Sequence, residues 1–132
     1  MPDVVRIARA IATNQIARFA PKVYLQLTGQ TGRGNANSES VADIARYFEF
    51  SVREYLARLA PQEVNAENYF AEKTVVEYGP GDFPGVAILI AAMGARKVYC
   101  VDRFPMVNLG EKNLEVLRLL SESLPLSSRR RL

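Results

Sequence analysis

The chain has 132 residues, of which 48% are hydrophobic and 23% are charged. This length and composition favour one folded domain and exclude an intrinsically disordered chain. The net charge of +3 comes from 17 basic and 14 acidic residues, and Arg129, Arg130 and Arg131 supply three of the basic ones. The excess charge therefore belongs to a C-terminal tail, which argues against a nucleic-acid partner.

The chain contains no histidine and one cysteine, Cys100. The lack of histidine excludes Ser-His-Asp and Cys-His catalysis by this chain alone, and no cluster of metal ligands is visible in the sequence. Cys100 is expected to act as a small hydrophobe inside a buried strand, in a reducing compartment. No apolar run reaches the roughly 18 residues that span a membrane, and no signal-peptide pattern is present. We expect a cytoplasmic protein with no membrane partner.

Residues 1–68 are predicted to form a helical N-terminal region. Val4, Ile7 and Ile11 recur at helical spacing, which predicts an amphipathic helix that packs on the domain or on a partner subunit and that Pro21 ends. Residues 22–27 are too few for periodicity to distinguish a helix from a strand. Residues 29–38 hold three glycines within six positions, which predicts a loop.

The clearest predicted helix begins after Ser40, where Asp43 three residues later gives a partial capping box. Apolar residues then recur at helical spacing until Pro61 ends the pattern. This stripe is typical of a helix that covers one face of a sheet. Residues 69–124 are predicted to form the second region of the chain.

The organising stretch of that region is a predicted strand, turn, helix and strand. The β-branched run 74–78 predicts the first strand, and Gly79-Pro80-Gly81-Asp82 breaks it. Residues 86–93 predict a buried helix that Gly94 closes, residues 97–101 predict an apolar second strand, and Asp102 follows at its end. The apolar second strand is typical of a parallel sheet that is covered on both faces.

This arrangement predicts a nucleotide-type site. Gly79 and Gly81 lack Cβ, so a ligand can approach the turn closely, and the following helix directs free N–H groups and a positive dipole end toward it. Asp102 lies 21 residues after Gly81, where a carboxylate of such a unit can accept hydrogen bonds from ribose hydroxyls.

The run Glu77-Tyr78-Gly79-Pro80-Gly81 resembles the first motif of the class I methyltransferases that use S-adenosylmethionine, in which an acid precedes a Gly-x-Gly turn. The resemblance covers about a quarter of the chain and implies a Rossmann-like sheet. It implies that the turn lies against the methionine part of the cofactor, that Glu77 orients the loop and the cofactor's ammonium, and that Asp102 binds the ribose. It also allows the 29–38 loop to be a lid beside the cofactor, as an alternative to a surface connection. The candidate cofactor-binding residues are Glu77, Gly79, Pro80, Gly81, Asp82, Asp102 and Arg103.

The motif departs from the family at one position, because the third glycine that often follows is replaced by Phe83, and the next glycine is Gly85. The alternative ligand is a nicotinamide dinucleotide, whose Gly-x-Gly-x-x-Gly fingerprint would require glycine at Pro84. Arg103 would suit the 2′-phosphate of NADP in that case. A βαβ unit that binds no cofactor is the remaining alternative.

After Asp102, residues 104–106 predict a bend against which an adenine ring could pack. Asn108 is predicted to be the N-cap of a last helix that ends at Pro125, and residues 125–132 are predicted to be a disordered basic tail.

The fold expected is α/β: N-terminal helices followed by the first βαβ unit of a Rossmann-like parallel sheet, apparently incomplete. Two strands leave sheet edges that a longer chain, a partner or a homo-oligomer would cover. The predicted function is the cofactor-binding, N-terminal part of an S-adenosylmethionine-dependent methyltransferase whose acceptor and catalytic residues the sequence does not name. The second prediction is a truncated, non-catalytic module for cofactor binding or oligomerisation.

Overall fold

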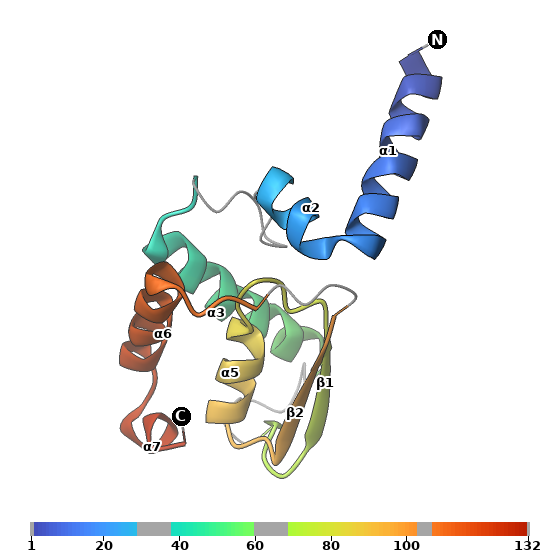
Figure 1. Cartoon of the computed structure of the whole chain (residues 1–132). Helices are drawn as coiled ribbons and strands as arrows, with labels where there is room; N and C mark the ends of the chain where they lie inside the picture. Colours follow the sequence, from blue (N-terminus) through green and yellow to red (C-terminus); the bar gives the residue numbers. More distant parts are fainter. Residues whose placement is uncertain (1, 29–37, 60–68, 103–106, 132) are drawn as a thin grey trace.

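The computed structural model describes residues 2–28, 38–59, 69–102 and 107–131. The elements in chain order are α1 (Pro2–Phe19), α2 (Pro21–Thr28), α3 (Val41–Leu59), β1 (Thr74–Tyr78), α5 (Gly85–Ala92), β2 (Lys97–Val101), α6 (Glu111–Ser123) and α7 (Leu126–Arg129). The chain is therefore rich in helices with one small parallel sheet, which is consistent with an incomplete α/β fold (Figure 1). Among the described residues, no helix combines the length and the apolar character needed to cross a membrane.

The predicted helices of the N-terminal region are present. Helix α1 ends before Pro21, as expected, and the ambiguous 22–27 segment belongs to α2. The hydroxyl of Ser40 accepts the N–H of Asp43 at 3.1 Å and donates to its carboxylate at 2.6 Å, so the cap predicted for α3 is confirmed. The Ser40 hydroxyl, and after it the Arg46 guanidinium, hold the pKa of Asp43 below its usual range. The glycine-rich segment 29–37 lies outside the described residues.

The two predicted strands pair in parallel in one register from Thr74 opposite Lys97 to Tyr78 opposite Val101. Helix α5 connects them and is buried over most of its length, which confirms the prediction from its uniformly apolar sequence. The carboxyl ends of both strands lie at one edge of the sheet, where β1 enters the glycine turn and β2 ends at Asp102. The fold thus brings the two candidate acids to the same end.

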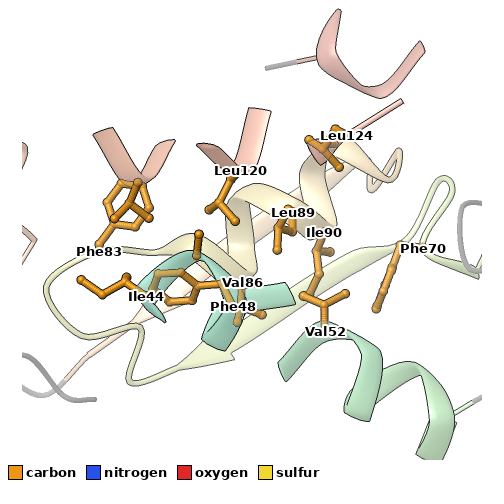
Figure 2. Packing of buried hydrophobic residues seen from close by; sticks show 13 residues of the cluster. Ile44, Phe48, Val52, Phe70, Phe83, Val86, Leu89, Ile90, Leu120 and Leu124 are labelled. Atoms are coloured by element: carbon orange, nitrogen blue, oxygen red, sulfur yellow. The ribbon is translucent and has the colours of Figure 1, made fainter. Parts of the chain in front are cut away.

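The hydrophobic core lies between α3, α5 and α6, on one face of the sheet (Figure 2). Phe48 of α3 is its central side chain, 2% exposed, and its ring lies 5.8 Å from that of Phe83. The core side chains labelled in Figure 2 come from these helices and from the loops around β1: Ile44, Phe48, Val52, Phe70, Phe83, Val86, Leu89, Ile90, Leu120 and Leu124. The core therefore fixes the start of α5, at the site end of the sheet.

The sequence prediction of a sheet covered on both faces is wrong for the described residues. Alternate side chains of β1 and β2 point away from the core and stay exposed, among them Val76 and Tyr99. Cys100 is also exposed, although it was expected to be buried. The helices packed on the sheet cover one side, which leaves Val76 and Tyr99 exposed. Cys100 lies on the covered side with Val98, but it is exposed because β2 is an edge strand.

Helix α6 begins later than predicted, at Glu111 with Gly110 as its N-cap, so the assignment of Asn108 as the cap is wrong. The Asn108 side chain instead accepts the N–H of Gly110 at 2.9 Å, a local turn that asparagine commonly makes. The tail expected to be disordered contains α7. Arg129 Nε donates to the carbonyl of Leu124 at 2.8 Å, which satisfies an acceptor at the end of α6.

Candidate functional site

The candidate site is the loop 79–84 between β1 and α5, together with Glu77 and Asp102. Gly79 and Gly81 have φ of +70° and +76°, a backbone region that other residues adopt only with strain. The N–H of Gly79 donates to the carbonyl of Val101 at 2.8 Å and so extends the pairing of the strands into the loop. A Cβ built on Gly79 meets nothing within 4 Å. The turn at Gly79 therefore presents bare backbone to open space.

Glu77 points back from β1 to the start of α5. Its Oε2 accepts the N–H of Ala87 at 3.1 Å, the third residue of that helix. The N-cap residue Pro84 makes no side-chain hydrogen bond to the helix. Glu77, from β1, instead accepts one of the first N–H groups of α5, and its carboxylate lies at the positive end of the helix dipole. Its position ties the strand, the loop and the helix together.

Burial raises the pKa of the Glu77 carboxyl above its usual range, although the N–H of Ala87 and the thiol of Cys100 act in the opposite direction. The Cys100 sulfur lies 3.7 Å from Glu77 Oε2. Burial, the Glu77 charge and this hydrogen bond raise the pKa of the Cys100 thiol. Cys100 is therefore held as a thiol, which is a poor nucleophile compared with a thiolate.

Asp102 meets the loop from the end of β2. Its Oδ2 accepts the N–H of Gly81 at 3.4 Å, a weak and long hydrogen bond in a partly buried setting. Residues 21 positions apart in the sequence are thus brought together at the carboxyl edge of the sheet. The loop has a carboxylate on each side: Glu77 toward α5 and Asp102 toward β2.

Asp82 is directed toward α6. Its carbonyl accepts the N–H of Asn108 at 2.7 Å, and its Oδ2 lies 3.3 Å from the amide nitrogen of Asn113. Asn113 also donates to the carbonyl of Asn108 at 2.8 Å and is 5% exposed. Asp82 and Asn113 thereby anchor the outer half of the loop. Asn113 was not among the residues predicted from the sequence, where its signal is a polar residue within the apolar stripe of the last helix.

Phe83 and Gly85 explain the departure from the expected glycine spacing. Phe83 is 1% exposed and fills the core against Phe48. A Cβ on Gly85 would lie 2.4 Å from the Phe48 ring, so the first residue of α5 must be glycine for α3 to approach it. Gly85, the next glycine after Gly79 and Gly81 in the sequence, therefore serves the packing of α3 against α5.

Pro80 and Gly81 are buried within the loop, and Gly79 is exposed. Arg103 and the predicted adenine-side bend at 104–106 lie outside the described residues. One cavity, of about 340 Å³, borders Glu77; it runs along β1 toward α3 and is otherwise lined mainly by apolar side chains, including Tyr55, Leu59 and Ile90. Within the described ranges no three His, Cys, Asp or Glu side chains are grouped to hold a metal ion.

Comparison of the chain with protein-family models, curated proteins and solved structures finds no match in any of the three.

Proposed function

We propose that the loop 79–84 binds S-adenosylmethionine and that the chain is the cofactor-binding part of a Rossmann-like methyltransferase. The observation that carries the proposal is the meeting of Asp102 with the Gly79–Gly81 turn, where Asp102 Oδ2 and the Gly81 N–H lie 3.4 Å apart. A carboxylate at the end of the second strand, beside a glycine turn after the first, is the arrangement that holds an adenosine ribose in nucleotide-binding α/β sheets.

The residues present fit this cofactor. The backbone of Gly79 is exposed, and no atom lies within 4 Å of the position that a Cβ would take, so the amino-acid part of the ligand could approach this backbone closely. The Asp102 carboxylate would accept hydrogen bonds from the two ribose hydroxyls. Glu77 would hold the loop in its binding conformation, because its carboxylate already braces the start of α5.

S-adenosylmethionine, when bound, supplies a sulfonium methyl group that an acceptor nucleophile displaces in line. In that chemistry this chain would orient the donor. Alignment of donor and acceptor lowers the activation barrier even where no side chain acts as an acid or a base. A base on the acceptor side is not assigned: the chain has no histidine, and the Cys100 thiol is held protonated by its raised pKa.

Binding without turnover is the second candidate function. The observation that favours it is the sheet of two strands, whose outer face is exposed in the described residues. In that case the loop would bind the same ligand, and methyl transfer would need groups from another chain.

Calorimetric titration of the chain with S-adenosylmethionine and S-adenosylhomocysteine tests the proposal, with NADH and NADPH as competing ligands. Asp102→Asn removes a charge-assisted hydrogen bond and should weaken sulfur-nucleotide binding about 10-fold or more. Glu115→Gln, on the exposed side of α6, removes the same charge away from the loop and should leave the affinity unchanged. Tighter binding of NADPH, or equal affinities for the two variants, would contradict the proposal.

A further inference from the structure

Helix α1 packs with its polar side toward α2. Arg6, Arg9 and Thr13 line a shallow cavity between the two helices together with Tyr24 of α2. Ala17 is the buried residue of this contact. An amphipathic helix normally turns its apolar side to its neighbours. In α1 the residue that is buried, Ala17, lies on the same side as Arg6 and Arg9, which stay exposed, so the apolar side does not face α2.

The apolar side of α1 is consequently exposed. Val4, Ile7 and Ile11 follow one another at helical spacing and are 70%, 59% and 56% exposed, and Phe19 at the end of the helix is 75% exposed. Figure 1 shows α1 projecting away from the body that α3, α5, α6 and the sheet form. A continuous apolar helix face of this kind marks an interaction surface.

The outer face of the sheet is the second uncovered apolar surface. Val76 lies opposite Tyr99 and Tyr78 lies opposite Val101 in the parallel register. Lys97 begins the same face, and its ammonium lies over the Tyr99 ring, 4.6 Å from the centroid. The four valine and tyrosine side chains are between 47% and 81% exposed. Parallel sheets are as a rule covered by helices on both faces, so this face has the chemistry of a surface that a helix covers.

The two surfaces match in kind, because one is an uncovered helix face and the other is a sheet face without a helix, and α1 is long enough to reach across the strands. Helix α1, with 18 residues, is about 27 Å long, and the five-residue strands span about 17 Å. At their exposed fractions, the eight residues named on the two faces present on the order of 1,000 Å² of accessible surface in each chain, and a standard interface takes about 800 Å² from each partner.

We propose that two copies of this chain associate reciprocally, with the α1 helix of each copy lying over the outer sheet face of the other. Each copy then gives one helix and receives one, so the contact closes as a symmetric dimer. This surface borders the loop 79–84, because Tyr78 and Val101 directly precede Gly79 and Asp102, but the proposal does not rest on the proposed function.

Light scattering coupled to gel filtration tests the association. At about 100 μM chain, we expect twice the 14.7 kDa mass of one chain. Ile11→Glu in α1, or Tyr99→Lys on the sheet, should give monomers, because each buries an unpaired charge in the contact. Arg6→Gln makes the same charge change as Ile11→Glu on the α2 side of α1 and should stay dimeric. Circular dichroism spectra equal to that of the unmodified chain would show that the variants fold.

Mixing the two monomeric variants tests which surfaces meet. The α1 of the Tyr99→Lys chain is intact and fits the intact sheet face of the Ile11→Glu chain, so the mixture should partly recover the dimer mass. Contacts between two α1 helices or between two sheets would show no recovery. A monomeric unmodified chain, a mixture without recovery, or a monomer that binds anionic phospholipid vesicles through α1 would each overturn the proposal.

Discussion

The two faces of the β1–β2 sheet are built from alternate residues of the same strands, but only one of them is covered. On the inner face, Val75 and Val98 pack against the cluster of α3, α5 and α6. On the outer face, Val76 and Tyr99 remain 47% exposed. Both sets have the composition of buried strand residues. The strand sequences are therefore suited to burial on two sides, whereas the described helices pack on one side within a single chain.

Substitutions in the core beneath the covered face should lower the stability of the chain most. Phe48→Ala should cost about 3–5 kcal/mol of unfolding free energy, because it leaves a cavity beside Phe83 at the centre of the core. Phe50→Ala, on the same helix but 59% exposed, should cost less than about 0.5 kcal/mol. Urea unfolding measures both. Equal costs would show that Phe48 is not a core residue.

Gly85→Ala should cost about 1–3 kcal/mol through overpacking, since the new methyl carbon would lie 2.4 Å from the Phe48 ring. Helix propensity alone predicts the opposite sign, a gain of about 1 kcal/mol. Adding Phe48→Leu, which narrows the side chain, should make the Gly85→Ala change less harmful in a double-mutant cycle. Additive costs in that cycle would contradict the close approach.

A matched pair of substitutions compares the two faces directly. Val75→Thr directs a hydroxyl into the apolar cluster and should cost about 1–2 kcal/mol. Val76→Thr makes the same change on the exposed face and should stay within about 0.5 kcal/mol. Denaturant midpoints in dilute protein measure the difference, where association does not contribute. A larger cost at Val76 would reverse the assignment of the faces.

The weakest effect that we predict is a pH dependence of stability caused by Glu77, which lies on the covered face. Because burial raises the pKa of Glu77, the folded state binds more protons than the unfolded state between the two pKa values, and the stability contribution of Glu77 falls as the pH rises through that window. The glutamine side chain of a Glu77→Gln variant does not titrate. The stability of this variant relative to the unmodified chain should therefore increase as the pH rises from the ordinary Glu pKa of about 4.3 through the raised pKa of Glu77. Thermal unfolding at several pH values measures it, and a relative decrease would show that the Glu77 pKa is lowered.

Local signals predicted much of the fold. The Ser40–Asp43 cap, the strand at 74–78 and the buried helix before Gly94 depend on neighbouring residues, and the structure contains all three. The prediction of Asn108 as an N-cap failed because its side chain accepts the N–H of Gly110 and α6 begins only after that residue. Asn113 was missed because its partners, Asp82 and Asn108, are set by the packing of α6 on the loop.

The candidate site was predicted in part. The positive-φ glycines and the approach of Asp102 to Gly81 follow from the strand-turn-helix-strand order. The position of Phe83 does not, because its partner Phe48 lies on α3, far earlier in the chain, and long-range packing leaves no local pattern. The exposure of Cys100 was likewise unpredictable from an apolar strand, since it depends on which helices cover the sheet.

Binding of the cofactor by the loop 79–84 can be observed residue by residue in a two-dimensional ¹H–¹⁵N NMR titration of the chain with S-adenosylhomocysteine. If the loop binds the cofactor, the amide signals of Gly79, Gly81 and Asp102 should shift and saturate together, while those of Gly94 and Gly110 at other turns stay unchanged. Saturable shifts confined to residues away from loop 79–84, or no shifts in a folded chain, would contradict the assignment of this loop as the cofactor site.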